Sequence, residues 1–218
     1  MKRTLIQFAK APVPGKVKTR LMERYSAEEA AQWHCRLTMH TWQQLLSVSA
    51  DSRQLWVSGD WQQNRPAHSW FQQEIFSDAH FIQQPEGDLG YKMTYALRQG
   101  KKNSDHVLLA GSDCPVLTGE ILESAFDCLR QPDNDLVLIP AEDGGFVLIG
   151  CSVMLSENTL DNLSWGHARV LQDTLQRLKD LQLSYTLLPA LWDIDHPEDT
   201  DRWLKHTRQT GKQKEQAN

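Results

Sequence analysis

The sequence contains few cysteines, no close cysteine pair and no long apolar run. Four cysteines occur among 218 residues, and none belongs to a C-x-x-C motif, so the sequence predicts neither a zinc knuckle nor a dithiol redox site. Unpaired cysteines are most simply kept in a reducing compartment. No apolar run is long enough to span a bilayer, and the chain begins with a strand-like segment instead of a signal-peptide core. We therefore expect a cytoplasmic protein without a membrane span.

The chain also lacks a strong excess of one charge. Its formal net charge is −5 at pH 7, and this mild acidity argues against a nucleic-acid partner, which would require a basic face. Hydrophobic residues make up 40% of the sequence, enough for one globular domain with a sizeable core. We expect that domain to span residues 1–207, followed by an irregular polar tail over 208–218. The sequence leaves the oligomeric state open.

Apolar strand-like segments alternate with helix-like segments along the chain. The predicted strands are the run at residues 5–8 and the segments 54–58, 79–83, 106–110, 135–139, 146–149 and 184–188. The predicted helices cover 26–47, 89–99, 118–129, 167–181 and 197–205. Ser26 and Glu29 form a capping box at the first helix, and Gly100 is predicted to end the second. The alternation predicts an α/β fold with a mostly parallel sheet, helices on both faces, and ligands at the carboxyl ends of the strands.

The loop after the first strand is stiff and basic. Pro12, Pro14 and Gly15 exclude a regular element there. Its cations are Lys10, Lys16, Lys18 and Arg20. Backbone N–H groups and cationic side chains that converge after a strand can bind phosphate, although an ordinary basic surface loop has the same composition. A Walker-type phosphate loop is excluded, because Val17 stands where that motif requires serine or threonine.

Asp113 follows the apolar strand 106–110 on a turn tightened by Gly111 and Pro115. A carboxylate at the end of a strand can hold Mg²⁺ or Mn²⁺ against a diphosphate. The alternative is an Asx turn in which the side chain caps its own loop. Cys114 has no histidine beside it in the sequence and is interpreted as a bystander thiol.

Two later segments are also rich in acidic residues. In the segment 140–146, Glu142 and Asp143 precede two glycines, a pattern that fits either a hairpin turn or a ligand that approaches the backbone closely. In the segment 192–199, Asp193 and Asp195 lie on one face of an extended piece, and either could complete a metal site with Asp113. Glu198 and Asp199 are explained by the dipole of the helix that Pro197 begins.

A weaker signal lies in the segment 84–90, just before a predicted helix. Gly87 and Gly90 can let a base or sugar lie against the backbone, but they can equally be loop punctuation.

Taken together, the motifs KAPVPGKVKTRL, GDLGYKM, GSDCPVLT, PAEDGGFVLIG and DIDHPED resemble a bacterial family of GT-A-like nucleotide-diphospho-sugar transferases, over roughly residues 2–204. That family is described as radical-SAM- or selenium-domain-associated transferases, or as arsenosugar-biosynthesis glycosyltransferases. The resemblance implies a single-domain, Rossmann-like GT-A fold. Two departures, Tyr91-Lys92 and Trp165-Gly166-His167, fall where a nucleotide or acceptor could be distinguished.

The resemblance also implies a set of site residues. The nucleotide-binding residues would be Lys10, Gly15, Lys18, Arg20, Gly87, Asp88 and Gly90. The acceptor-binding residues would be Glu142, Gly144, Gly145 and Trp165. The catalytic residues would be Asp113, Asp143 and Asp195, with Asp113 and Asp195 holding Mg²⁺ or Mn²⁺.

The function expected from these residues is metal-dependent glycosyl transfer from a nucleotide sugar to a small-molecule acceptor. Cations and the metal would neutralise the diphosphate leaving group. Two alternatives remain: a nucleotidyltransferase that joins an NTP to a phosphorylated acceptor with release of pyrophosphate, and a nucleotide-binding protein without turnover.

Overall fold

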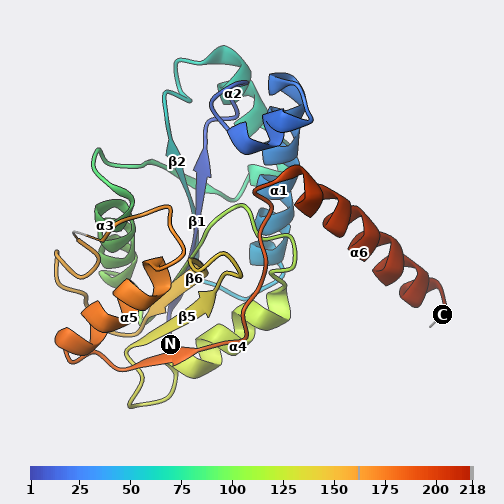
Figure 1. Cartoon of the computed structure of the whole chain (residues 1–218). Helices are drawn as coiled ribbons and strands as arrows, with labels where there is room; N and C mark the ends of the chain where they lie inside the picture. Colours follow the sequence, from blue (N-terminus) through green and yellow to red (C-terminus); the bar gives the residue numbers. More distant parts are fainter. Residues whose placement is uncertain (162, 217–218) are drawn as a thin grey trace.

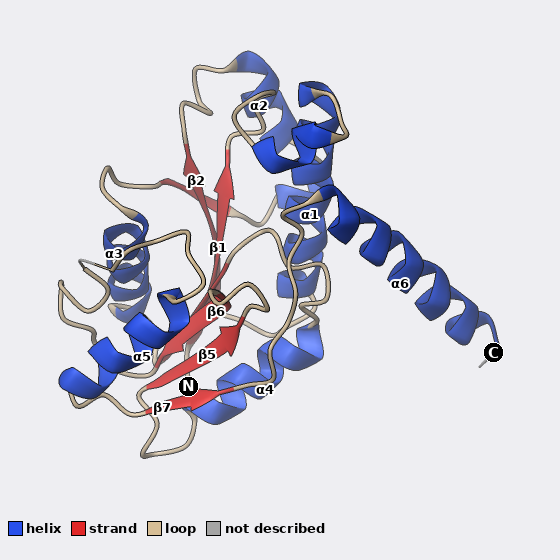
Figure 2. Cartoon of the chain, in the orientation of Figure 1, coloured by secondary structure: helices blue, strands red, loops and turns tan. Residues whose placement is uncertain are grey.

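The computed structural model describes residues 1–161 and 163–216, which form one seven-stranded sheet flanked by helices (Figures 1 and 2). The strands are β1 (Arg3–Lys10), β2 (Ser52–Ser58), β3 (His80–Gln83), β4 (His106–Ala110), β5 (Leu136–Pro140), β6 (Phe146–Cys151) and β7 (Tyr185–Leu187). The α-helices are α1 (Ala27–Leu46), α2 (Arg65–Phe71), α3 (Leu89–Lys101), α4 (Gly119–Leu129), α5 (Val170–Asp180) and α6 (Pro197–Gln216). Short 3₁₀ helices are η1 (Thr19–Glu23) and η2 (Glu74–Phe76).

The strand order of the sheet is β3-β2-β1-β4-β6-β5-β7. β6 is antiparallel to both of its neighbours, and every other pair in the sheet is parallel. The predicted mostly parallel α/β sheet is therefore confirmed. Because the chain moves from β1 to β2 and β3 on one side and to β4 on the other, the strand order reverses between β1 and β4. Crevices in such sheets form at this reversal, outside the carboxyl ends of the strands.

Each face of the sheet carries its own apolar core. Successive residues of β1 point to opposite faces, so that Leu5 belongs to one core and Ile6 to the other. Trp42 of α1 and Phe126 of α4 fill the first core, and Leu97 of α3 belongs to the second, which also contains residues of α5. This arrangement explains why strands covered on both faces have apolar residues in succession, and it confirms helices on both faces.

Several predicted elements differ from the structure. The strand 106–110 and the start of the last helix at Pro197 are reproduced, but α2 and η1 were not predicted. The helix predicted from residue 167 begins at Val170. Gly100 does not end its helix: α3 continues to Lys101, and a Cβ atom at residue 100 would lie 2.9 Å from Cγ1 of Val107. The glycine thus permits close packing of α3 on β4.

The last helix is longer than predicted. α6 continues to Gln216, where an irregular tail was expected from residue 208, and Figure 1 shows it projecting away from the sheet. Its sequence after residue 197 contains no proline and is rich in lysine and glutamine, which tolerate a helix well. Its first turns are held to the body, since Arg24 donates to Asp201 at 2.9 Å and the hydroxyl groups of Tyr25 and Thr200 lie 2.9 Å apart.

Within the described ranges, no helix combines the length and apolar character needed to cross a membrane. All four cysteines are free.

Candidate active site

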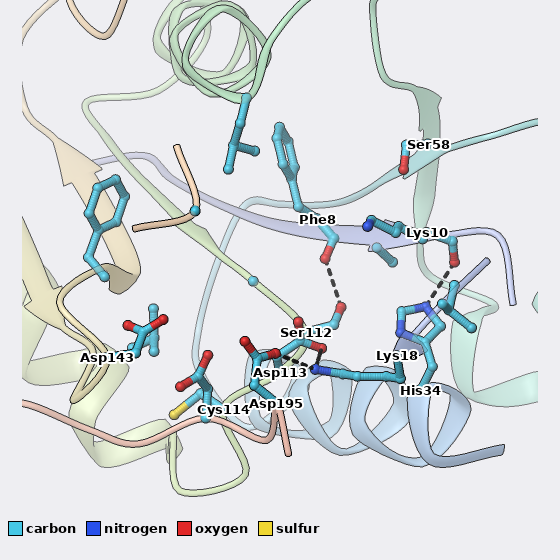
Figure 3. A pocket seen from close by; sticks show the side chains of 18 of the residues that line it. Phe8, Lys10, Lys18, His34, Ser58, Ser112, Asp113, Cys114, Asp143 and Asp195 are labelled. Atoms are coloured by element: carbon cyan, nitrogen blue, oxygen red, sulfur yellow. Dashed lines mark hydrogen bonds and ion pairs between the residues drawn. The ribbon is translucent and has the colours of Figure 1, made fainter. Parts of the chain in front are cut away.

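A pocket of about 700 Å³ lies at the carboxyl ends of the parallel strands, at the reversal between β1 and β4 (Figure 3). Its residues include those of the loops after β1 and β4, the loop between β5 and β6, the start of β6 and the segment before α6. Others come from α1, from α3 and from the segment 166–168. The charged residues in its lining are Lys10, Lys18, Arg20, Asp113, Asp143, Asp193 and Asp195. The structure thus brings together side chains from four sequence segments that were predicted to bind a ligand.

Backbone hydrogen bonds bring the acidic segments to one place. Ile194 N donates to the carbonyl oxygen of Asp113 at 2.9 Å, which fixes Asp193 and Asp195 beside the loop after β4. Three residues earlier, Leu191 N donates to the carbonyl oxygen of Pro140 at 2.9 Å, and this bond holds the same segment against the end of β5. The chain therefore crosses the ends of β4 and β5 just before it enters α6.

A buried polar bridge positions the loop that carries Asp113. Gln7 of β1 donates to Ser112 Oγ at 2.8 Å. Ser112 Oγ in turn donates to the carbonyl oxygen of Phe8 at 2.7 Å (Figure 3). Both side chains are buried, and Gln7 Nε2 also donates to the carbonyl oxygen of Thr38 at 3.0 Å, so several buried hydrogen bonds fix this geometry. These hydrogen bonds hold Ser112, the residue before Asp113, against β1, and this fixes the position of the Asp113 carboxylate.

Lys18 lies at the centre of the charged end of the pocket. Its ammonium group is 2.8 Å from Oδ1 of Asp113 and 3.5 Å from Oδ1 of Asp195, and it also donates to the carbonyl oxygen of Ile194. Its side chain is only 5% exposed. The residue adopts a left-handed backbone (φ 47°, ψ 43°), which costs a residue with a Cβ atom about 1–2 kcal/mol. The fold thus holds this side chain among oxygen atoms in spite of local backbone strain.

The pKa values of Asp113 and His34 are both lowered, but by different causes. Burial by itself raises the pKa of Asp113, but the positive charges of Lys18 and, to a smaller extent, His34 and Lys10 outweigh it, and the pKa lies below its ordinary value. Burial lowers the pKa of His34, whose Nε2 donates to the carbonyl oxygen of Lys10 at 2.9 Å. Near neutral pH Asp113 is therefore charged and His34 is neutral.

A cluster of three carboxylates lies next to the pair formed by Lys18 and Asp113. Asp143, Asp193 and Asp195 each present an oxygen atom, and these atoms lie within 4.8 Å of one another. Burial and the charges of Asp195 and Asp143 raise the pKa of Asp193 to about 7. Carboxylate oxygens are the ligands that Mg²⁺ and Mn²⁺ prefer, so this donor set fits the expected metal.

The arrangement differs from the predicted metal pair. Asp195 belongs to the carboxylate cluster, but an oxygen of Asp113 faces the Lys18 ammonium instead. Asp195 also accepts a hydrogen bond from Arg20 at 2.7 Å. In this structure, therefore, Asp193 and Asp143 complement Asp195 in the geometry of a metal site, and Asp113 and Asp195 are joined by a lysine.

The predicted glycine-loop residues do not line the pocket in the part of the chain that the structure describes. Asp88 caps α3, where its side chain accepts from Tyr91 N at 2.8 Å. A Cβ atom on Gly90 would lie 2.1 Å from the carbonyl oxygen of Leu160, so this glycine permits close packing. Gly15 and Gly87 both have positive φ angles, of 77° and 132°. These contacts give the loop a structural role, and nucleotide binding by these four residues stays a prediction.

The predicted acceptor residues lie around the edge of the pocket. Glu142 forms two hydrogen bonds with Arg202 of α6, at 2.7 and 3.0 Å, and so points away from the cavity. Gly145 N donates to Asp143 Oδ1 at 2.9 Å, as a turn residue would. A Cβ atom on Gly144 would lie 2.1 Å from the carbonyl oxygen of Ala168. Trp165 packs edge-on against Phe146, which does line the pocket.

Three pocket residues were not among the predicted site residues, although two of them, Gln84 and His167, lie in segments that the sequence analysis singled out. His34, Gln84 and His167 all line the cavity. His34 sits on the apolar face of α1, and nothing in that pattern indicates that it reaches the end of β1. Gln84 directly follows β3 and donates to the carbonyl oxygens of Ala9 and Trp56, at 3.2 and 2.9 Å. Its position at a strand end is the one sequence signal that could have identified it.

Comparison with known proteins decides the family. A family model described as "Uncharacterized protein conserved in bacteria (DUF2064)" matches residues 41–167, more than half of the chain. The chain belongs to the DUF2064 family. Comparison with curated proteins finds no match.

Solved structures similar to this DUF2064 chain include transferases. A Desulfovibrio desulfuricans protein, described as a candidate nucleotide-diphospho-sugar transferase, is 30% identical, with a TM-score of 0.79 over 90% of this chain and 84% of that chain. CMP:2-keto-3-deoxy-manno-octonic acid synthetase in complex with CTP is 10% identical, with a TM-score of 0.61 over 96% and 100% of the two chains. Rv0371c of Mycobacterium tuberculosis in complex with manganese is 15% identical, with a TM-score of 0.53 over 94% and 98%.

The second and third of these similarities concern the fold alone. The first, together with the family match, confirms the predicted family, the Rossmann-like α/β fold and the transferase class.

Proposed function

We propose that this DUF2064 protein transfers a glycosyl group from a nucleotide-activated sugar to a small-molecule acceptor, with the aid of Mg²⁺ or Mn²⁺. The observation that carries the proposal is the charge arrangement of the pocket. Three cations, Lys10, Lys18 and Arg20, line the same cavity as a cluster of three carboxylates, at the carboxyl ends of the strands. Cations for phosphate and oxygen ligands for a metal are the two requirements of a diphosphate leaving group. The relative from Desulfovibrio desulfuricans, with its description, supports the same class of donor.

The basic loop would bind the phosphates. Lys10 ends β1, and Lys18 and Arg20 lie on either side of the start of η1, so three cations from one stretch of chain line the cavity. The guanidinium group of Arg20 is half-exposed and can reach a bound anion without leaving Asp195. A planar guanidinium group grips phosphate oxygens in pairs, which a lysine cannot do.

The carboxylates would hold the metal. Asp143, Asp193 and Asp195 would supply its oxygen ligands, and Asp113 lies next to them. A divalent ion there would neutralise charge that develops on the leaving diphosphate. Asp143 lies in the turn between β5 and β6 and lines the same pocket as His167, and the acceptor would bind beside these two residues. The apolar lining residues Phe8, Met93 and Leu109 would contact the nucleoside.

Nucleotidyl transfer is the second candidate. The specific observation in its favour is that the solved structures with the same fold include a synthetase in complex with CTP. In this reaction a phosphate oxygen of the acceptor attacks the α-phosphorus of the nucleotide, and pyrophosphate leaves. The same loop and the same carboxylates would serve both reactions.

Product analysis distinguishes these candidates. The wild-type protein is incubated with Mn²⁺, small-molecule acceptors and either NTPs or nucleotide sugars, with Asp195→Asn as the inactive control. Release of a nucleoside diphosphate from one nucleotide sugar would support glycosyl transfer. Release of pyrophosphate from an NTP would support nucleotidyl transfer. Nucleotide binding without either product, over broad acceptor panels, would contradict both and leave a binding protein.

A further inference from the structure

The position of Lys18 has a consequence for how the metal enters the site. An ammonium group that contacts both Asp113 and Asp195 stands between the two carboxylates that were expected to share a metal ion. The side chain is almost fully buried, and the carbonyl oxygen of Ile194 is its third oxygen partner. Three oxygen atoms around one buried positive charge resemble the surroundings of a bound cation.

We propose that the ammonium group of Lys18 takes the place of a metal cation between Asp113 and Asp195 in the metal-free protein, and that it leaves both carboxylates when the metal binds. This inference rests on the proposed metal-dependent function. After leaving, the ammonium group can turn toward the phosphates, whose charge then replaces that of the carboxylates. Metal binding and phosphate binding are thereby coupled, because each one makes room for the other.

Two further features of the residue support a movable cation. Lys18 has a left-handed backbone at the junction between the proline-containing loop and η1, so a change of its backbone toward a relaxed conformation would release strain. In addition, Arg20 already contacts the second oxygen of Asp195, at 2.7 Å, so this carboxylate keeps a positive partner when Lys18 departs.

Lys10 provides a matched control. It lines the same pocket and carries the same charge, but its ammonium group makes no ion pair with a described residue. Replacing it by glutamine removes a positive charge from the pocket without opening the space between Asp113 and Asp195. Any general electrostatic gain in metal affinity is therefore measured by Lys10→Gln.

The first test is titration with Mn²⁺ alone. Lys18→Gln should bind Mn²⁺ at least about 5-fold more tightly than the wild type, the lower end of the coupling usually found between two sites. Lys10→Gln should gain clearly less, and Lys18→Arg should stay close to the wild type. Lys18→Met, which retains the buried aliphatic stem, serves as a second neutral variant, and melting curves confirm that each variant is folded. Equal affinity of the wild type and a folded Lys18→Gln or Lys18→Met would overturn the inference.

The second test uses only the wild-type chain, so it does not depend on the folding of a variant. Acetylation of individual lysines by acetic anhydride is followed by mass spectrometry, with and without saturating Mn²⁺. The proposal predicts that Lys18 is protected in the metal-free protein and reacts faster once Mn²⁺ is bound. Lys16, exposed in the same loop, should react at the same rate in both states. Unchanged protection of Lys18 at saturating Mn²⁺ would show a permanent structural ion pair and overturn the inference.

The two tests also separate this inference from the proposed function. If the wild type binds Mn²⁺ as tightly as the neutral variants do, Lys18 is no obstacle, and the metal-dependent function stands. If no variant binds Mn²⁺, the metal dependence itself fails, and the inference fails with it.

Discussion

Two pairs of aspartates in the same pocket have opposite electrostatic surroundings. Asp113 and Asp195 contact Lys18, and Asp195 also contacts Arg20. Asp143 and Asp193 form no ion pair with any cation among the described residues, although they lie within a few ångströms of Asp195. As a result, the pKa of Asp113 is lowered, whereas that of Asp193 is raised to about 7. Lys18 and Arg20 neutralise the first pair, whereas in the second pair the charge of Asp193 is left to a proton or a metal ion.

This difference teaches that the number of acidic residues does not define the site. Four carboxylates line the pocket, and two cations divide them into two halves. In the balanced half, Lys18 and Arg20 pair with Asp113 and Asp195. In the unbalanced half, Asp143 and Asp193 lie close to Asp195 without an ion pair to a described cation. Asp195 belongs to both halves, since it contacts Lys18 and lies in the carboxylate cluster. The comparison therefore predicts different results for similar substitutions, with the largest effect at Asp195.

Asp195→Asn should have the largest effect. It removes a charge that both halves share, and we expect Mn²⁺ affinity to fall by about 10–100-fold, as it does when a residue that supports a metal site is lost. Titration with Mn²⁺ measures the loss, with Glu198→Gln as the control, because Glu198 is largely exposed outside the pocket. Unchanged affinity in the folded variant would remove Asp195 from the metal site.

Asp193→Asn tests the unbalanced half through pH. Because burial and the neighbouring carboxylates raise the pKa of Asp193 to about 7, the folded protein keeps this proton in a range where the unfolded chain has lost it. The free energy of unfolding contributed by this group is therefore present in acid, falls as pH rises from about 4 to about 7, and stays low above that.

Asparagine removes this dependence. Near pH 8 the variant should have a higher free energy of unfolding than the wild type, and each kcal/mol of this difference raises the melting temperature by about 2–4 °C. Near pH 4 the two melting temperatures should be equal. Melting curves at both pH values, without metal, check this expectation. An equal difference at both pH values would contradict the raised pKa. In the wild type, Mn²⁺ affinity should increase as pH rises through about 7, since metal ligands must be deprotonated.

Asp199→Ala should have a smaller, mixed effect. Its carboxylate accepts from the N–H groups of Asp195 and His196, at 3.0 and 2.7 Å, so it holds the backbone that presents Asp195. The sequence interpretation gave it only a helix-dipole role. We expect a loss of about 1 kcal/mol in the free energy of unfolding, as for other lost caps, with a few-fold loss of Mn²⁺ affinity. Glu198→Ala, in the same turn, should leave Mn²⁺ affinity unchanged; a similar loss there would point to the helix dipole instead.

Arg20→Lys should have the smallest effect. The guanidinium group is half-exposed, and exposed charge pairs contribute only about 0.2–1 kcal/mol, so affinity for a nucleoside diphosphate should fall about 5-fold or less. The loss should shrink at high salt, because the interaction is screened. Titration at low and high salt measures it. Equal weakening of a nucleoside and its diphosphate would mean that Arg20 does not bind phosphate.

Much of the fold could be predicted from local sequence patterns. The strand 106–110 was predicted at its observed bounds, because a nearly all-apolar run is typical of a parallel strand that is covered on both faces. α2 was missed, because its short, aromatic sequence has no clear helical period. The prediction that Gly100 ends its helix was wrong, because the glycine is explained by the close packing of α3 on Val107, which the local sequence does not show.

The site was predictable only in part, for the same reason. Strand ends placed Lys18, Asp113 and Asp195 near one another, since parallel strands share one edge. The ion pairs within this group depend on the hydrogen bond between Ile194 and Asp113, which joins residues far apart in the sequence. His34 reaches the site from a helix, and no local pattern reports such a contact.

The measurement that tests the central claim most directly is the melting temperature of the wild type with each nucleoside and its diphosphate, with and without Mn²⁺. If the basic loop and the carboxylates bind a metal–diphosphate group, one diphosphate with Mn²⁺ should stabilise the fold while its nucleoside does not. At a concentration near 100 times the Kd, mass action gives about 2.7 kcal/mol. For a chain of this size that corresponds to a rise of about 5–10 °C. Equal shifts with nucleoside and diphosphate, or no dependence on phosphate and Mn²⁺, would contradict the account.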